Sequence, residues 1–194
     1  MEKTAVQRLA KVLRMLILAV FALNLFCLLL VPLFARLAAD RQLFSMLQYL
    51  RENLPDYPIH TLGRVLMVWP ITFLAVWSDW RGALLTLFFW LCGTCTALIL
   101  WQAKRVLDTI LEGKPFQLKN ARALNRAAVC CWIISGTALA RLLWWLAHDH
   151  GAAPFFTYNT LFVPAVLMAG LLFQVMSALF RQAAELKKDQ DLTI

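Results

Sequence analysis

Four long apolar runs constrain this chain more than any other feature of its sequence. They cover residues 15–34, 82–101, 127–147 and 160–180, and a single polar residue, Asn24, interrupts the first. An α-helix rises ~1.5 Å per residue, so about twenty residues cross the ~30 Å hydrocarbon core of a bilayer. Only 15% of the chain is charged, whereas a soluble domain carries about a quarter. The sequence therefore predicts an all-α, integral membrane four-helix bundle.

The cations predict how the four spans are oriented. Thirteen of the 19 lysines and arginines lie in the leader before residue 15, the loop 102–126 or the tail 181–194, and the loop 148–159 has none. Segments rich in lysine and arginine stay in the cytoplasm. We therefore expect a protein of the bacterial inner membrane with both termini on the cytoplasmic side. The net charge of +8 makes membrane lipid an expected partner. The cation-rich loop lacks the interleaved aromatics of a nucleic-acid surface, so we expect no direct nucleic-acid binding.

The segment 35–81, between the first two spans, is the least regular part of the pattern. Residues 42–52 have the spacing of an amphipathic helix, and residues 53–59 contain two prolines. Residues 62–78 are apolar enough for a fifth span, but that span would place the six cations of the 102–126 loop outside. We therefore expect an extracytoplasmic segment that is amphipathic, re-entrant or an extension of the next helix.

The polar interval between the second and third spans carries the best turn signals. Gly113 suits the left-handed position after a helix, and Pro115 cannot continue one, so we expect the second helix to pass beyond the membrane and end there. Asn120 is the predicted N-cap of the third helix. Arg122 and Arg126 are one turn apart, which predicts one face near the lipid headgroups.

Two groups of residues together resemble a known family. They are Glu112-Gly113-Lys114-Pro115-Phe116 with Asn120, and Leu179-Phe180 with Ala184-Glu185-Leu186 and Asp191-Leu192-Thr193-Ile194. The chain resembles the bacterial four-span membrane family catalogued as domain of unknown function 2975. The resemblance implies no chemistry, because that family has none assigned. It implies a gene that often lies near one for a small helix-turn-helix regulator. Residues 187–190 are more basic here than in the family pattern.

Polar residues within the spans offer other hypotheses. Cys92 and Cys95 have the spacing of a redox pair, but thiolate chemistry needs an accessible, electropositive site, and small residues there favour helix packing. Arg141 lies about six residues inside the outer end of the third span. An intramembrane arginine usually has a partner or lines a wet cavity. We expect a partnership with Asn24, Asp79 or Asp149, the alternative being that Arg141 reaches the headgroups unaided.

The predicted function is a non-enzymatic membrane module that signals to or holds a cytoplasmic protein, such as a helix-turn-helix regulator. Residues 114–126 and 185–194 would form its contact surface. No catalytic, cofactor or metal site is predicted. Two alternatives stay open: a small transporter or accessory subunit with Arg141 and Asn24 in a polar path, and a thiol oxidoreductase using Cys92 and Cys95. The sequence also leaves the oligomeric state open, a homo-oligomer included.

Overall fold

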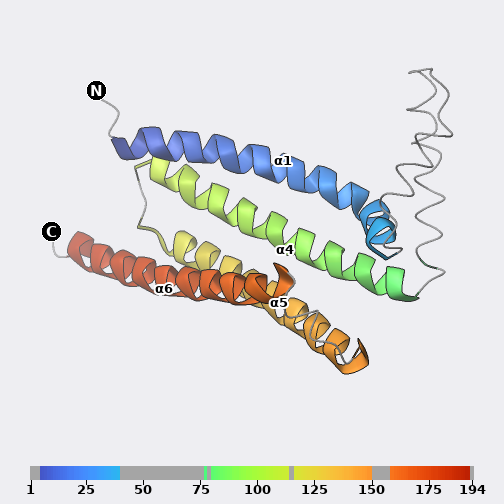
Figure 1. Cartoon of the computed structure of the whole chain (residues 1–194). Helices are drawn as coiled ribbons and strands as arrows, with labels where there is room; N and C mark the ends of the chain where they lie inside the picture. The colour runs from blue at the N-terminus through green and yellow to red at the C-terminus, as the bar shows by residue number, and fades with distance from the viewer. Residues whose placement is uncertain (1–4, 40–76, 78–79, 114–115, 150–157, 193–194) are drawn as a thin grey trace, which may run out of the picture. The chain divides into compact units, whose positions relative to one another are not determined.

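A computed structural model of the chain shows long α-helices in the parts that it describes (Figure 1). It describes residues 5–39, 77, 80–113, 116–149 and 158–192. These form α1 (Ala5–Ala39), α4 (Trp80–Leu111), α5 (Leu118–Asp149) and α6 (Tyr158–Leu192), with no strand in the described ranges. The predicted all-α class is confirmed. The proposed extracytoplasmic segment lies outside the described residues, except that α1 continues to Ala39 and Trp77 and Trp80 are helical.

All four helices are long and apolar enough to cross a membrane, which indicates a multi-pass membrane protein. The candidate spans are Arg8–Pro32, Gly82–Leu111, Leu118–Trp144 and Leu161–Gln190. The helices contain 35, 32, 32 and 35 residues, or roughly 50 Å each at ~1.5 Å per residue, against a hydrocarbon core of ~30 Å. Each helix can therefore continue past the membrane, as the sequence predicts for the second.

The chain divides into two compact units, one of residues 1–24 with 94–194 and one of residues 25–93. α5 lies wholly in the first unit and is the most enclosed of the four helices. In its apolar stretch 39% of the residues are buried, whereas at most 11% are buried in each of the other three helices. Most of the buried side chains of α5 are small. The buried set is Asn120, Ala121, Ala123, Ala127, Ala128, Cys130, Cys131, Ile134, Ser135 and Ala138. Small residues let helix backbones approach closely in lipid, so α5 is built to be packed on several sides.

The close approach of α5 and α6 depends on a glycine of α6. A Cβ atom added to Gly170 would lie 2.6 Å from Cδ1 of Trp132 and 3.1 Å from Cβ of Cys131. Ser135 Oγ donates to the carbonyl oxygen of Val163 (3.1 Å), and Ser177 Oγ donates to that of Ala121 (2.7 Å). These contacts fix an antiparallel register between the two helices.

In the second unit, α4 compensates for a proline in α1. Pro32 is fully buried inside α1 and has no backbone N–H, so the carbonyl of Leu28, four residues earlier, lacks its helical donor. Trp90 Nε1 donates to this carbonyl oxygen at 3.3 Å. A Cβ on Gly93 would lie 2.7 Å from Cδ2 of Leu28. An unpaired carbonyl is costly in hydrocarbon, so Trp90 stabilises the interruption that Pro32 makes.

We expect Trp90→Phe to lower the free energy of unfolding by about 1–3 kcal/mol, because it leaves the Leu28 carbonyl unpaired. Thermal unfolding in detergent measures the loss. The control repeats the substitution in a Pro32→Ala background, where the backbone N–H of the introduced alanine can supply the helical donor. The loss should shrink there, and an equal loss in both backgrounds would rule out the carbonyl as its cause.

Candidate functional site

The polar ends of the helices in the first unit gather at one place. The Arg14 Nε atom lies 3.0 Å from Asp108 Oδ1, and the rings of Phe21 and Trp101 are 6.0 Å apart, so the first part of α1 runs antiparallel to the last part of α4. A short turn joins α4 to α5, and α6 runs antiparallel to α5. The start of α1, the end of α4, the start of α5 and the end of α6 therefore lie together (Figure 1).

We call this region the basic end, formed by residues 5–14, 104–113, 116–126 and 175–192. Cations outnumber acids there. The described cations are Arg8, Lys11, Arg14, Lys104, Arg105, Lys119, Arg122, Arg126, Arg181, Lys187 and Lys188, and the acidic side chains are Asp108, Glu112, Glu185 and Asp189. Arg122 and Arg126 are exposed, as expected for residues near headgroups. The structure thus brings the three cation-rich segments of the sequence together.

The turn after α4 has the predicted geometry. The helix ends at Leu111, and Gly113 follows with φ 75°, which is the left-handed C′ conformation. The Gly113 N–H donates to the carbonyl oxygen of Ile110 at 3.1 Å, and the Glu112 N–H donates to that of Asp108 at 3.1 Å. The predicted end of this helix is confirmed, whereas Lys114 and Pro115 lie outside the described residues.

Asn120 holds the two helices of this turn together. Its side chain is 2% exposed, and its Nδ2 donates to Thr109 Oγ1 at 2.6 Å. Thr109 Oγ1 in turn donates to the carbonyl oxygen of Val106 at 2.7 Å. The prediction that Asn120 caps the third helix is wrong, because α5 begins at Leu118 and Asn120 lies inside its first turn. The side chain instead bonds across to α4.

The two sequence groups that carry the family resemblance meet at the basic end. The ring of Phe116, from the first group, lies 5.9 Å from the ring of Phe180, from the second. The hydrogen bond from Ser177 on α6 to Ala121 on α5 lies within one helical turn of this ring contact. The turn after α4 and the last part of α6 therefore form one surface, although more than sixty residues separate them in the chain.

The last part of α6 extends past the start of α5. Leu118 starts α5 three residues before Ala121, so Phe180, three residues after Ser177, is level with that start. The residues from Arg181 to Leu192 extend about 18 Å further, at ~1.5 Å per residue (Figure 1). Residues 185–190 are all exposed, including Leu186 at 66%. We call residues 181–192 the α6 tail.

The remaining predicted residues lie elsewhere or outside the described set. Asn24 Oδ1 is buried and accepts no hydrogen bond from the described residues. Arg141 is exposed on α5, and its proposed pairing with Asp79 or Asp149 involves side chains outside those described. Thr193 and Ile194 lie outside the described residues as well, and the side chain of Asp191 is also not described.

The five cysteines lie within the helices at different depths. Cys27 is exposed and Cys92 is half-buried, while Cys95, Cys130 and Cys131 are buried. The described residues contain no group of three His, Cys, Asp or Glu side chains that could hold a metal ion. Burial among small residues is what the packing interpretation expects.

Sequence reasoning missed two hydroxyl groups that position the basic end, those of Thr109 and Ser177. Thr109 lies just before the predicted end of the second helix, and Ser177 lies just before the predicted end of the fourth span. That position is a usable signal, because a hydroxyl there can bond either to its own helix or to a neighbour. Only the register of the helices decides which, and the sequence does not contain it.

Comparison with known proteins identifies a family. The sequence model of a family described as "Protein of unknown function (DUF2975)" matches residues 33–194. No curated protein and no solved structure matches the chain. The matched range includes the turn after α4, all of α5 and all of α6, and so it contains the surface where Phe116 meets Phe180.

Proposed function

The chain belongs to the DUF2975 family, and we propose that it is a non-enzymatic module of the bacterial inner membrane whose basic end holds a soluble protein in the cytoplasm. Cation-rich ends stay on the cytoplasmic side, which supports this orientation. A small helix-turn-helix regulator is the class of partner that the family resemblance suggests. The function would be to retain such a protein at the membrane or release it.

The observation that carries the proposal is the α6 tail. Leu186 is 66% exposed on it, and Leu179 and Val175, at 54% and 58% exposure, lie on the same side of the helix. An apolar stripe therefore runs along α6 and out onto the tail. Proteins recognise such a helix by laying its apolar face in a groove. Leu186, which lies beyond the start of α5, is the part of this stripe that such a groove would take, and the exposed polar residues beside it would form the rim.

The charges of the tail favour a protein over a lipid surface. Its exposed residues include three cations, Arg181, Lys187 and Lys188, and two acids, Glu185 and Asp189. Helices that lie on membranes have polar faces rich in lysine and arginine. The ion pair between Arg181 and Glu185, at 3.0 Å, lies within the exposed helix and adds little stability. The mixed charges of the tail are therefore better suited to select a protein partner than to bind a lipid surface.

The same helix provides a route for a signal. From Tyr158 to Leu192 α6 is continuous, and its first two-thirds pack against α5. A shift in the packing of α5 against α6 would therefore move the tail as part of one rigid element. A partner held on the tail would sense that shift.

Capture of the partner by the tagged, full-length protein tests the proposal. Leu186→Gln removes the apolar anchor and keeps a residue with good helix propensity. We expect it to lower the captured amount of a specific soluble protein by about tenfold or more, as loss of a central anchor does. The control is Lys187→Gln, which introduces the same residue one position away, on another side of the helix.

Deletion of residues 185–194 should abolish capture and leave membrane insertion intact. The proposal would be wrong if Leu186→Gln and Lys187→Gln captured the same proteins in the same amounts as the unaltered chain.

A further inference from the structure

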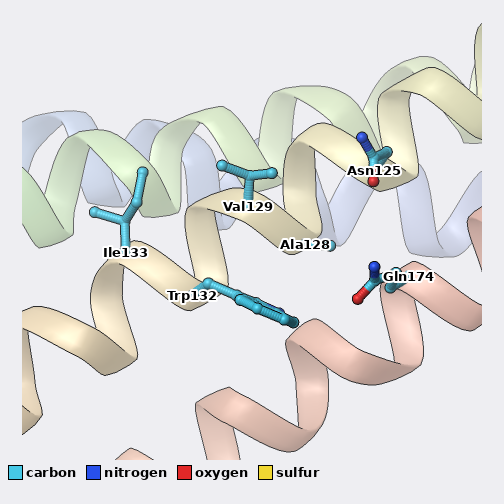
Figure 2. Close-up of a pocket in the computed structure, with 6 residues that line it drawn as sticks. All are labelled: Asn125, Ala128, Val129, Trp132, Ile133 and Gln174. Carbon is cyan, nitrogen blue, oxygen red and sulfur yellow. The ribbon is translucent and has the colours of Figure 1, made fainter.

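A groove of about 340 Å³ lies between α5 and α6. Figure 2 shows the side chains that line it, which are Asn125, Ala128, Val129, Trp132 and Ile133 from α5 and Gln174 from α6. The five α5 residues recur at helical spacing and so form one side of that helix. The groove is therefore a continuous strip along α5, bordered by α6.

The two amide side chains lie at the same end of the groove, one on each helix. The hydrogen bond from Ser177 to Ala121 sets the register, and Gln174 lies three residues before Ser177 while Asn125 lies four residues after Ala121. The two amides are therefore level with one another in the antiparallel pair, as Figure 2 shows. Both side chains are exposed.

The other end of the groove is apolar and has an aromatic wall. The indole of Trp132 lies against Gly170 of α6, where a Cβ would come within 2.6 Å of it. Val129 and Ile133 complete this end, and both are exposed, at 52% and 40%. The groove is thus polar toward the basic end and apolar away from it.

Two exposed arginines extend the polar end. Arg122 precedes Asn125 by three residues and so lies on the same side of α5, and Arg126 is its neighbour in the chain. Guanidinium groups bind phosphate through two parallel hydrogen bonds. The side-chain amides of Asn125 and Gln174 offer further N–H donors. These donors need acceptors, because an unpaired polar group is costly at the edge of a bilayer.

We propose that this groove binds one anionic glycerophospholipid from the leaflet at the basic end. Its phosphate would pair with Arg122 and Arg126, and its ester oxygens would accept hydrogen bonds from Asn125 and Gln174. An acyl chain would lie along Val129, Trp132 and Ile133. A zwitterionic headgroup is disfavoured, because its own cation would face the two arginines. This site does not depend on the proposed protein partner.

Native mass spectrometry of the detergent-purified protein, with phosphatidylglycerol or phosphatidylcholine added at equal concentration, tests the site. We expect one phosphatidylglycerol retained per chain and roughly tenfold less phosphatidylcholine. Arg122→Gln with Arg126→Gln should lower phosphatidylglycerol retention by about tenfold or more. Asn125→Leu with Gln174→Leu should lower it as well, with an unchanged helix content showing that the variant folds.

The matched control is Lys104→Gln with Arg105→Gln. The bond from Asn120 to Thr109 sets the register of α4 against α5, so these two cations lie on α4 about level with Arg126. Their loss lowers the net charge by the same amount as the loss of Arg122 and Arg126. Retention should survive this change. Equal losses in the two double variants, equal retention of both lipids, or a second copy of the chain bound in place of lipid would each overturn the proposal.

Discussion

Replacing Asn120 with leucine is expected to lower the free energy of unfolding by about 1.5–4.5 kcal/mol. The side chain is 2% exposed and its Nδ2 donates to Thr109 Oγ1 at 2.6 Å. Leucine removes that bond, for about 0.5–1.5 kcal/mol, and places a branched apolar group of different shape against the hydroxyl, for about 1–3 kcal/mol more. Thermal unfolding in detergent measures the change.

Asn125→Leu provides the matched control. It makes the same substitution on the same helix, five residues on, but the Asn125 side chain is exposed. We expect a change within about 0.5 kcal/mol, as at most surface positions. If the two variants lost stability equally, the bond between Asn120 and Thr109 would not be what holds α4 and α5 together.

Gly170→Ala is expected to separate α5 from α6 and to lower stability by about 1–3 kcal/mol. The added Cβ would lie 2.6 Å and 2.8 Å from two atoms of the Trp132 indole and 3.1 Å from Cβ of Cys131. The indole can move, but Cys131 Cβ is fixed to the backbone, so the helices must shift. Thermal unfolding again measures the loss.

Two further variants isolate the cause. Gly136→Ala on α5 adds the same methyl group where nothing lies within 4 Å, so it should not destabilise the protein. Trp132→Leu should recover part of the stability lost in Gly170→Ala, because the smaller side chain leaves room. If Trp132→Leu left the loss in Gly170→Ala unchanged, the strain would lie at Cys131 and not at the indole.

The sequence predicted the helices better than their ends. Apolar runs mark the part of a helix that meets hydrocarbon, so they identify four spans. They do not mark where the backbone hydrogen bonds stop. For this reason α1 begins at Ala5, before the run at 15–34, and α6 continues from 180 to Leu192. Gly113 is the exception, because a left-handed residue followed by proline at 115 ends a helix through local geometry alone.

The contacts between helices could not be predicted from the sequence, and the reason is physical. The N-cap predicted for Asn120 was wrong, because a side chain that can cap its own helix can also bond to the neighbouring helix. The pairing of Trp90 with the carbonyl freed by Pro32 likewise depends on how α1 and α4 slide past one another. Register is set by the sum of many contacts, and no single residue signals it.

Photo-cross-linking from position 186 in living cells tests the central claim most directly. Leu186 would be replaced by a photoreactive phenylalanine analogue in the full chain, and Leu161, which is 77% exposed near the start of α6, would carry the same group as control. We predict a discrete adduct with one soluble cytoplasmic protein from position 186 and none from position 161. Adducts of position 186 with lipid or with a second copy of the chain alone would contradict a partner-holding basic end.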